Sequence, residues 1–584
     1  MSLAPLAEDK NDYNVIIMSD AGKPIFARHG SDQEIARICG LLQAIRTAST
    51  TNEALELGEI QCLESDHLCV VFMSVGSITL VSIAKATQGI VETEAFCRLQ
   101  LEYLYAQLIF NFTEQIQTIF RHNPGYDLRS IMSAEDNLLH GLLEETGPEG
   151  NAGPFLVGGV QSVFPISHKI RKKTSQVLQS VGSKTENLAF ALMVLGDKLV
   201  SLVQPSYRPH QLKVSDLHLI LHFLSKQPGM LTSELWIPMC LPRFNSSGFL
   251  YAYTFCLDVE MKLCLVLISS HNTTEQFQLL RTASAQIREE LGFPSTTDNI
   301  LTVASNSAST SAHDGASGGM PNDIAWTREE SFDVDEDYVN VSRDAPTDRR
   351  KNNTPIYWSL LQEVRESIEL SSMEHIVQKY LDGHADESSL LLHFLFRLDV
   401  AVKTTTTASG NARQYAGGKG YLTQCISPHP IPFAMTSSTT RRRVWTYYQQ
   451  LNLRLRLGSA TSESCHDALD MISQDSTDVG TNNNNAASSG GSNVMEDAFP
   501  GIAKDCPVMG LMESPPNVHG VTYIAEEQEI FLAMNGRDFE LYMVVSTGNG
   551  ITIKQAAALG AKLVRQLRSD EKQLFLSSPL TWRE

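Results

Sequence analysis

The sequence predicts an α+β protein made of three units of the same design, each an antiparallel five-stranded sheet flanked by helices. Short apolar segments with a period of two alternate along the chain with longer segments in which apolar residues recur every three or four positions. Each unit repeats one order: two strands, a helix, three strands and a closing helix. With 584 residues, the chain is long enough for about three or four domains that each bury a core.

The first unit is expected over residues 11–145. Its strands are predicted at 14–19, 25–28, 57–63, 68–74 and 78–84. Ser31 and Glu34 have the spacing of a capping box, so we expect a helix to begin there and to end near Thr47. A longer helix is predicted over roughly 91–121, because apolar residues recur along it at helical spacing.

The second unit is expected over 154–292. Strands are predicted at 187–195, 199–204, 236–242, 248–259 and 262–270, and helices at 167–181, around 217–224 and at 274–291. Pro238 and Pro242 bracket the third of these strands, which indicates an edge position because proline cannot donate a ladder hydrogen bond. We expect Trp236 and Phe244 to pack over this unit, with a partner contact as the alternative.

The third unit is expected over 354–584, after a disordered linker at 293–353 that is rich in serine, threonine and glycine. Its strands are predicted at 392–400, 421–427, 521–525, 529–535 and 539–545, and its helices at 440–457 and 551–568. Two polar tracts, near 403–420 and 459–515, read as disordered insertions, because periodic segments resume after each of them.

The composition excludes several classes of protein. A net charge of −20 repels nucleic-acid phosphates, so we expect no nucleic-acid partner. No apolar run approaches the length of about 18 residues that a membrane-spanning helix needs, and the N-terminus has no secretory signal pattern. The ten cysteines form no CxxC pair and lie mostly in apolar runs, so we expect reduced core residues and a cytoplasmic protein.

Catalytic patterns are missing from the predicted folded segments. There is no phosphate-binding loop, no G-x-G-x-x-G and no H-E-x-x-H, and a G-x-S-x-G around Ser317 falls in the linker. His218 and His222 are one helical turn apart but lack a third ligand, so we interpret them as part of a core helix. We therefore expect no cofactor, no metal and no covalent chemistry.

Two basic clusters open predicted helices, HKIRKK at 168–173 and RRR at 441–443. Clustered cations of this kind can attract an anionic or phosphoinositide membrane surface, although a solvated helix face is the alternative. The candidate lipid-binding residues are Lys169, Arg171, Lys172, Lys173, Arg441, Arg442 and Arg443.

Several segments resemble the SAND family, whose Mon-type subunit forms the Mon–Ccz complex. The segments are GKPIFARHGSD (22–32), GYDLRSIM (125–132) with DNLL (136–139), DLHLILHFL (216–224), WIPMCLPRFNSSGFLYAY (236–253), and FELYM (539–543) through LFLSSPLTW (574–582). They occur in all three units, and the long WxPxCLPxFNxxGF segment is the most specific. The resemblance fails over 294–352, 403–420 and 459–515.

The resemblance implies three longin domains in a subunit of a heterodimeric guanine-nucleotide exchange factor. Its partners would be a Ccz-type longin subunit and a late-endosomal Rab GTPase. The complex would be recruited from the cytoplasm to endosome and vacuole membranes to promote their fusion. A longin-domain trafficking scaffold or adaptor without exchange activity is the alternative, because fold alone does not decide function.

In that family the first longin domains of the two subunits pair and present the GTPase-binding surface, which here points to the first hairpin. The residues that we expect to contact the GTPase or the partner are Lys23, Pro24, Ile25, Phe26, Arg28, His29 and Gly30. The alternative is a purely structural tight hairpin, in which Gly22 and Pro24 shape the turn and Ile25 packs in the core.

Overall fold

The structure is a computed structural model in which only part of the chain is described. The described residues are 13–50, 59–86, 92–123, 126, 128–129, 136–147, 150, 152–156, 158, 163–207, 210–232, 234–293, 355–370, 391–399, 423–426, 438–457, 520–536, 539–548, 550–576 and 579–582. The linker expected at 293–353, apart from its first residue, lies outside them. Both expected insertions and Ser317 also lie outside the described residues.

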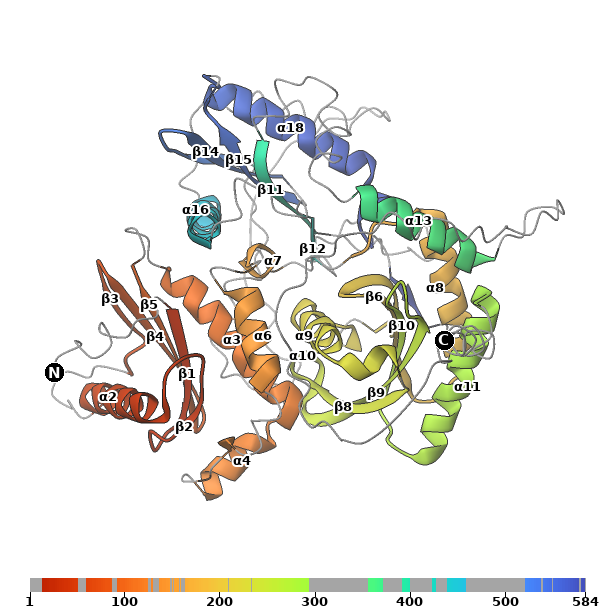
Figure 1. Cartoon of the computed structure of the whole chain (residues 1–584), viewed down its shortest axis with the longest axis horizontal. Helices are drawn as coiled ribbons and strands as arrows, with labels where there is room; N and C mark the ends of the chain where they lie inside the picture. The colour runs from red at the N-terminus through yellow and green to blue at the C-terminus, as the bar shows by residue number, and fades with distance from the viewer. Residues whose placement is uncertain are drawn as a thin grey trace, which may run out of the picture.

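The described residues form three sheets (Figure 1), in each of which five antiparallel strands follow the same order. The first sheet is β2 (Pro24–Ala27), β1 (Tyr13–Ser19), β5 (Ile78–Lys85), β4 (Leu68–Val75) and β3 (Cys62–Ser65). The second is β7 (Lys198–Gln204), β6 (Leu188–Leu195), β10 (Leu263–Ser269), β9 (Ser246–Asp258) and β8 (Leu235–Leu241). The third is β12 (Thr423–Ile426), β11 (Leu391–Asp399), β15 (Phe539–Ser546), β14 (Glu529–Asn535) and β13 (Gly520–Ala525). The predicted α+β class with flanked antiparallel sheets is therefore confirmed.

The first sheet lies between two helices, α2 (Asp32–Thr50) and α3 (Glu94–Phe112). The side chains of β1 alternate, so that Ile16 joins the α2 face whereas Val15 joins the α3 face. The predicted capping box at the start of α2 is present, because the backbone N–H of Ser31 donates to Glu34 Oε2 over 2.9 Å.

The long helix predicted over 91–121 is instead two helices, α3 and α4 (Gln115–His122). The chain breaks at Thr113, whose φ of 57° lies in the left-handed region. The next backbone N–H, from Glu114, donates to Ser246 O of the second unit over 2.9 Å. A contact with a distant part of the chain thus accompanies the break, which local periodicity could not reveal.

The second sheet packs against α9 (Val214–Ser225) on one face and against α8 (His168–Gly182) and α11 (Thr274–Leu291) on the other. The short turns η2 (Pro228–Leu231) and α10 (Pro242–Asn245) flank β8. β8 is an edge strand, as its prolines predicted. Trp236 stacks on Tyr251 with ring centroids 5.8 Å apart, and Phe244 meets Phe190 edge-on, so both aromatics pack on this unit as expected.

The third sheet lies between α16 (Ser438–Leu457) and α18 (Ile553–Ser569). Five further elements were not predicted from the sequence. They are α6 (Asp136–Thr146), α7 (Gly153–Leu156), α13 (Ile356–Leu370), α19 (Glu571–Leu574) and the short strand β16 (Leu580–Thr581). β16 adds to the second sheet by pairing in parallel with β7, although its residues fall in the range expected for the third unit.

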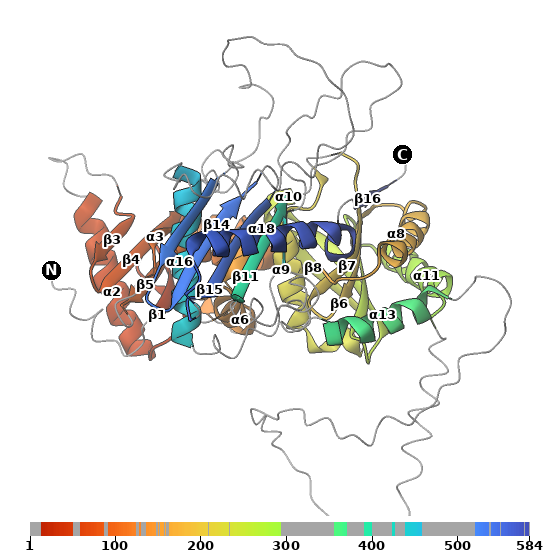
Figure 2. The same ribbon diagram turned by 90° about the horizontal axis from the view of Figure 1, so that it is seen from above.

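The first and third units share one apolar core, and both views place α16 beside the first unit (Figures 1 and 2). Leu101 and Leu104 of α3 belong to the same buried cluster as Trp445 and Tyr448 of α16. The indole N–H of Trp445 donates to Gly150 O over 2.9 Å, which ties α16 to the segment that follows the first unit. The three sheets are therefore packed together across their unit boundaries.

Candidate partner-binding surface

The first hairpin contains a β-bulge that turns two predicted contact residues into core. Ile17 pairs with Phe26 whereas Met18 pairs with Pro24, so Ile25 is the extra residue in β2. As a result, Ile25 and Phe26 join the same apolar cluster, and each is only 5% exposed. The ring of Phe26 lies 5.0 Å from that of His140 in α6. The prediction that these two side chains contact a partner is therefore corrected: they form the hairpin's interior.

The other predicted contact residues lie at the surface of the hairpin. Lys23, Pro24, Arg28 and His29 are half-buried and Gly30 is exposed. The backbone of His29 exchanges two hydrogen bonds with the side chain of Asn14, of 3.1 and 3.2 Å. The Arg28 guanidinium lies 5.6 Å from the centre of the Tyr13 ring, a cation–π distance.

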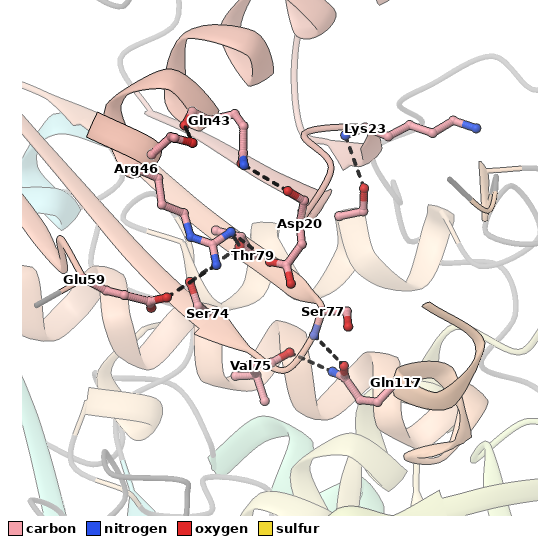
Figure 3. A network of polar contacts seen from close by, with 12 residues as sticks. Asp20, Lys23, Gln43, Arg46, Glu59, Ser74, Val75, Ser77, Thr79 and Gln117 are labelled. Atoms are coloured by element: carbon pink, nitrogen blue, oxygen red, sulfur yellow. Dashed lines mark hydrogen bonds and ion pairs between the residues drawn. The ribbon is translucent and has the colours of Figure 1, made fainter. Parts of the chain in front are cut away.

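Two side chains of α2 hold the hairpin turn in place (Figure 3). Gln43 Nε2 donates to Asp20 O over 2.9 Å, and Arg46 Nη1 donates to Asp20 Oδ1 over 2.8 Å. The same Arg46 nitrogen reaches Thr79 Oγ1 at 2.9 Å, and Nη2 lies 3.6 Å from Glu59. Arg46 thus connects the hairpin turn, the start of β5 and the segment before β3.

The neighbouring turn between β4 and β5 is braced from the other side by α4 (Figure 3). Ser77 N donates to Gln117 Oε1 over 2.9 Å, and Gln117 Nε2 donates to Val75 O over 2.8 Å. Asp20 N also donates to Ser77 O over 3.0 Å, which joins the two turns directly. One end of the first sheet is therefore a braced, pre-organised tip. Sequence reasoning missed Asp20, Arg46 and Gln117 because no local pattern links them.

The surface beside the hairpin carries polar and small side chains. The outward face of α2 carries Gln33, Ala36, Arg37 and Gly40, all exposed. Within residues 13–50, no large apolar side chain is exposed. β2 is an edge strand, paired only with β1 within the described sheet. At this end of the molecule, a partner would therefore meet charged groups, main-chain groups and a strand edge instead of an exposed hydrophobic patch.

The residues of the first basic cluster, which lie on α8, differ in their exposure to solvent. Lys169, Lys172 and Lys173 are exposed, whereas Arg171 is buried at 4% exposure. Arg171 donates to the carbonyl oxygens of Val200 and Phe164 at 3.0 and 2.9 Å, and burial lowers its pKa to about 10. The prediction that Arg171 binds lipid is corrected, because its guanidinium faces the interior.

The second basic cluster lies at the junction of the first and third units, where Arg442 is the one buried member. Arg442 forms a buried ion pair with Glu92 and donates to Lys85 O over 2.7 Å. Arg443 pairs with Glu529 of β14, and Arg441 is half-buried. The prediction that Arg442 binds lipid is corrected, because its guanidinium is buried against Glu92. For Arg441 and Arg443, which are only half-buried, lipid binding stays a prediction.

Within the described residues, no group of three or more His, Cys, Asp or Glu side chains has the geometry to hold a metal ion. His222 bridges α9 and α6, with Nδ1 2.9 Å from Glu145 Oε2 and Nε2 2.9 Å from Leu138 O. His218 stacks on Phe155, with ring centroids 4.6 Å apart. Every described helix is too short or too polar to cross a bilayer.

A buried carboxylate explains part of the WIPMCLPRFN segment. Asp216 Oδ1 accepts the backbone N–H of Arg243 over 3.1 Å at the start of α10, and Asp216 is fully buried. Burial raises the pKa of Asp216 to about 7, although the backbone hydrogen bond opposes this shift. The same desolvation raises the pKa of Glu102, on the facing helix α3, to about 7. The hydrogen bond of Asp216 thus holds the start of α10 against α9 within the second unit.

Comparison with known proteins gives two family-model matches and a group of relatives. Residues 13–142 match the first longin domain of FUZ, MON1 and HPS1, and residues 186–288 match the second. The vacuolar fusion protein MON1 homolog A of Gallus gallus is 30% identical over 279 residues, which are 48% of this chain and 48% of that protein. The vacuolar fusion protein MON1 of Yarrowia lipolytica is 32% identical over 276 residues, 47% and 48% of the two chains. Protein SAND of Takifugu rubripes is 30% identical over 262 residues, 44% and 46%. The chain spans about half the length of these curated relatives.

Proposed function

The chain belongs to the SAND/Mon family, and we propose from that premise that it is one subunit of a heterodimeric guanine-nucleotide exchange factor. With a Ccz-type longin subunit, it would release GDP from a late-endosomal Rab GTPase and so promote fusion with the vacuole or lysosome. The observation that carries the proposal is the match to the first two longin domains in order, on two sheets of the same topology.

Nucleotide exchange is compatible with a surface that has no reacting side chain. An exchange factor breaks no bond; it binds the GTPase more tightly in a conformation that holds nucleotide poorly. Weakening a picomolar nucleotide to micromolar affinity requires about 8 kcal/mol of differential binding. A rigid interface supplies such energy best, because little conformational entropy is lost when it binds. The hairpin tip braced by Arg46 and Gln117 has this rigidity.

We place the GTPase or partner contact on the surface part of the first hairpin: Lys23, Pro24, Arg28, His29 and Gly30. These residues lie along the outer strand edge and beside the first turn of α2. Ile25 and Phe26 would act indirectly, by holding β2 in its bulged shape.

The test is GDP release from a late-endosomal Rab GTPase loaded with a fluorescent nucleotide, measured with and without the Ccz-type subunit. We expect the heterodimer to accelerate release. The double variant Lys23→Ala/Arg28→Ala should slow it by about tenfold or more, the effect of losing interface anchors. Lys184→Ala, an exposed lysine of the second unit, is the matched control and should leave release unchanged.

Two outcomes would count against parts of this proposal. Release that the heterodimer does not change would refute the exchange function and leave a longin-domain scaffold. Acceleration that survives the hairpin substitutions would retain the exchange function and move the GTPase contact elsewhere.

We also propose that the exposed lysines of α8, Lys169, Lys172 and Lys173, contact an anionic or phosphoinositide membrane surface. Each lysine near such a surface contributes about 1 kcal/mol. Vesicle sedimentation should therefore need anionic lipid and should weaken with added salt.

The triple alanine variant of these lysines should bind anionic vesicles at least about tenfold more weakly. A variant with Lys184, Lys554 and Lys572 replaced by alanine removes the same charge from exposed positions elsewhere and should bind normally. Equal losses in both variants would mean that overall charge, and not α8, determines the binding.

A further inference from the structure

The last described residues of the chain dock on the second unit. Leu574 and Phe575 belong to the core of the third unit, whereas Leu576 belongs to a core cluster of the second. Residues 580 and 581 then form β16, in which Leu580 pairs with Val203 and Thr581 with Gln204, parallel to β7. The C-terminal segment thus extends a sheet that is built from residues far earlier in the chain.

The indole ring of Trp582, in the docked segment, lies in a slot on the second unit. Trp582 N donates to Gln204 O over 2.9 Å, and Trp582 Nε1 donates to Ala189 O over 2.9 Å. The floor of the slot is Gly182, the last residue of α8. A Cβ atom on Gly182 would lie 2.5 Å from Trp582 Cζ3, which is closer than real Cβ contacts allow. The slot therefore exists only because residue 182 has no side chain.

Two side chains of α8 bond to main-chain groups near the end of the chain, one in α19 of the third unit and one in the docked segment itself. Arg171 Nη2 donates to Gln573 O over 2.9 Å, and the side-chain amide of Gln179 donates to Thr581 O. Both acceptors are backbone carbonyl oxygens, so these bonds do not depend on the side chains of the segment. Sequence selectivity is concentrated in the indole and its slot.

These contacts have the form of strand addition to a sheet edge, where main-chain bonds supply affinity and one pocket supplies specificity. We propose that the β7 edge of the second unit, together with Gln179 and the slot over Gly182, is a strand-binding site whose ligand is the chain's own C-terminal segment, 579–582. The site covers a sheet edge that could otherwise pair with another chain. This proposal is independent of the exchange function.

Hydrogen exchange on the full-length chain tests the proposal. We expect Trp582→Ala and Gly182→Ala each to raise exchange in 198–204 by about tenfold, the effect of losing one stabilising hydrogen bond or its equivalent. The opposite edge, 235–241, should keep its protection in both variants. Gly182→Ala is informative because alanine favours the helix that contains it, so the loss would come from the slot and not from α8. Unchanged protection of 198–204 in both variants would overturn the proposal.

A second measurement tests binding in trans. The probe is a fluorescein-labelled peptide of residues 574–584, titrated into the full-length Trp582→Ala chain and followed by anisotropy. We expect binding there, at least about tenfold weaker binding to the intact chain because its own segment competes, and none after Gly182→Ala is added. Equal binding to all three chains, or no binding to the Trp582→Ala chain, would overturn the strand-binding site. Protection of 198–204 that rises with protein concentration would assign the strand to a second copy and overturn the assignment to the same chain.

Discussion

The buried ion pair between Arg442 and Glu92 gives the sharpest test of how the first and third units are joined. The two side chains are only 7% and 3% exposed. Arg442 also donates to Lys85 O over 2.7 Å. Replacing Arg442 with alanine leaves the Glu92 carboxylate buried without its guanidinium, and such a loss costs about 3–5 kcal/mol. Arg442→Ala should therefore destabilise the junction strongly.

Urea unfolding followed by tryptophan fluorescence is the assay, because Trp445 lies at this junction one turn along α16. The matched control is Arg443→Ala, the next residue in the sequence. Its side chain is 36% exposed and pairs with a partly buried Glu529, so we expect a loss of no more than about 1 kcal/mol. Two adjacent arginines should thus differ several-fold in effect.

A double substitution separates the ion pair from simple packing. Arg442→Met combined with Glu92→Leu replaces two buried charges with apolar side chains, which is often neutral for stability. We expect the double variant to be more stable than either Arg442→Met or Glu92→Leu alone. If the two single losses simply add, or if Arg442→Ala costs less than about 1 kcal/mol, the reasoning is refuted.

Three further predictions follow from burial and backbone geometry. Burial raises the pKa of Asp216 to about 7 in the folded state, so the folded protein binds this proton more tightly and its stability should fall as pH rises through about 7. Asp216→Asn should therefore flatten the fall in melting temperature between pH 5 and 8. An unchanged slope would contradict this. Gly22→Ala should lower the free energy of unfolding in urea by about 1–2 kcal/mol, because the backbone φ of Gly22 is +74°. Gly40→Ala, whose new Cβ would lie in open space on α2, should be neutral or stabilising. Equal effects of the two substitutions would contradict this reasoning. Phe26→Ala should lower the free energy of unfolding by about 3–5 kcal/mol, because a buried ring is removed. Lys23→Ala should change it by no more than about 0.5 kcal/mol. An equally small loss for Phe26→Ala would disprove the core position of Phe26.

Local signals in the sequence were sufficient for most of the secondary structure. The alternating strands and the Ser31–Glu34 capping box depend on neighbours within a few residues, and they appear close to where they were predicted. The exception is the strand predicted at 57–63, which the structure places at Cys62–Ser65. The break at Thr113 could not be predicted in this way. It has no glycine or proline, and it accompanies a backbone hydrogen bond from Glu114 to a strand of another unit.

The candidate sites show the same limit more clearly. Arg171 and Arg442 belong to basic runs that resemble a solvated helix face, yet each is buried against groups from distant segments. The residue that pairs with Arg442 lies 350 positions away. The bulge that buries Phe26 depends on the register between two strands, which composition does not encode. Exposure, and therefore availability for binding, was the property that sequence reasoning predicted least well.

The cluster common to α3 and α16 has a practical meaning for anyone who divides this chain into pieces. A fragment that stops before α16 would uncover the apolar side of α3 that Trp445 and Tyr448 now shield, and would tend to precipitate. The three units are therefore not independent domains, because each of them packs against another through shared core contacts. Loss of activity in a shortened protein would then reflect collapse of the scaffold and could not by itself locate the binding surface.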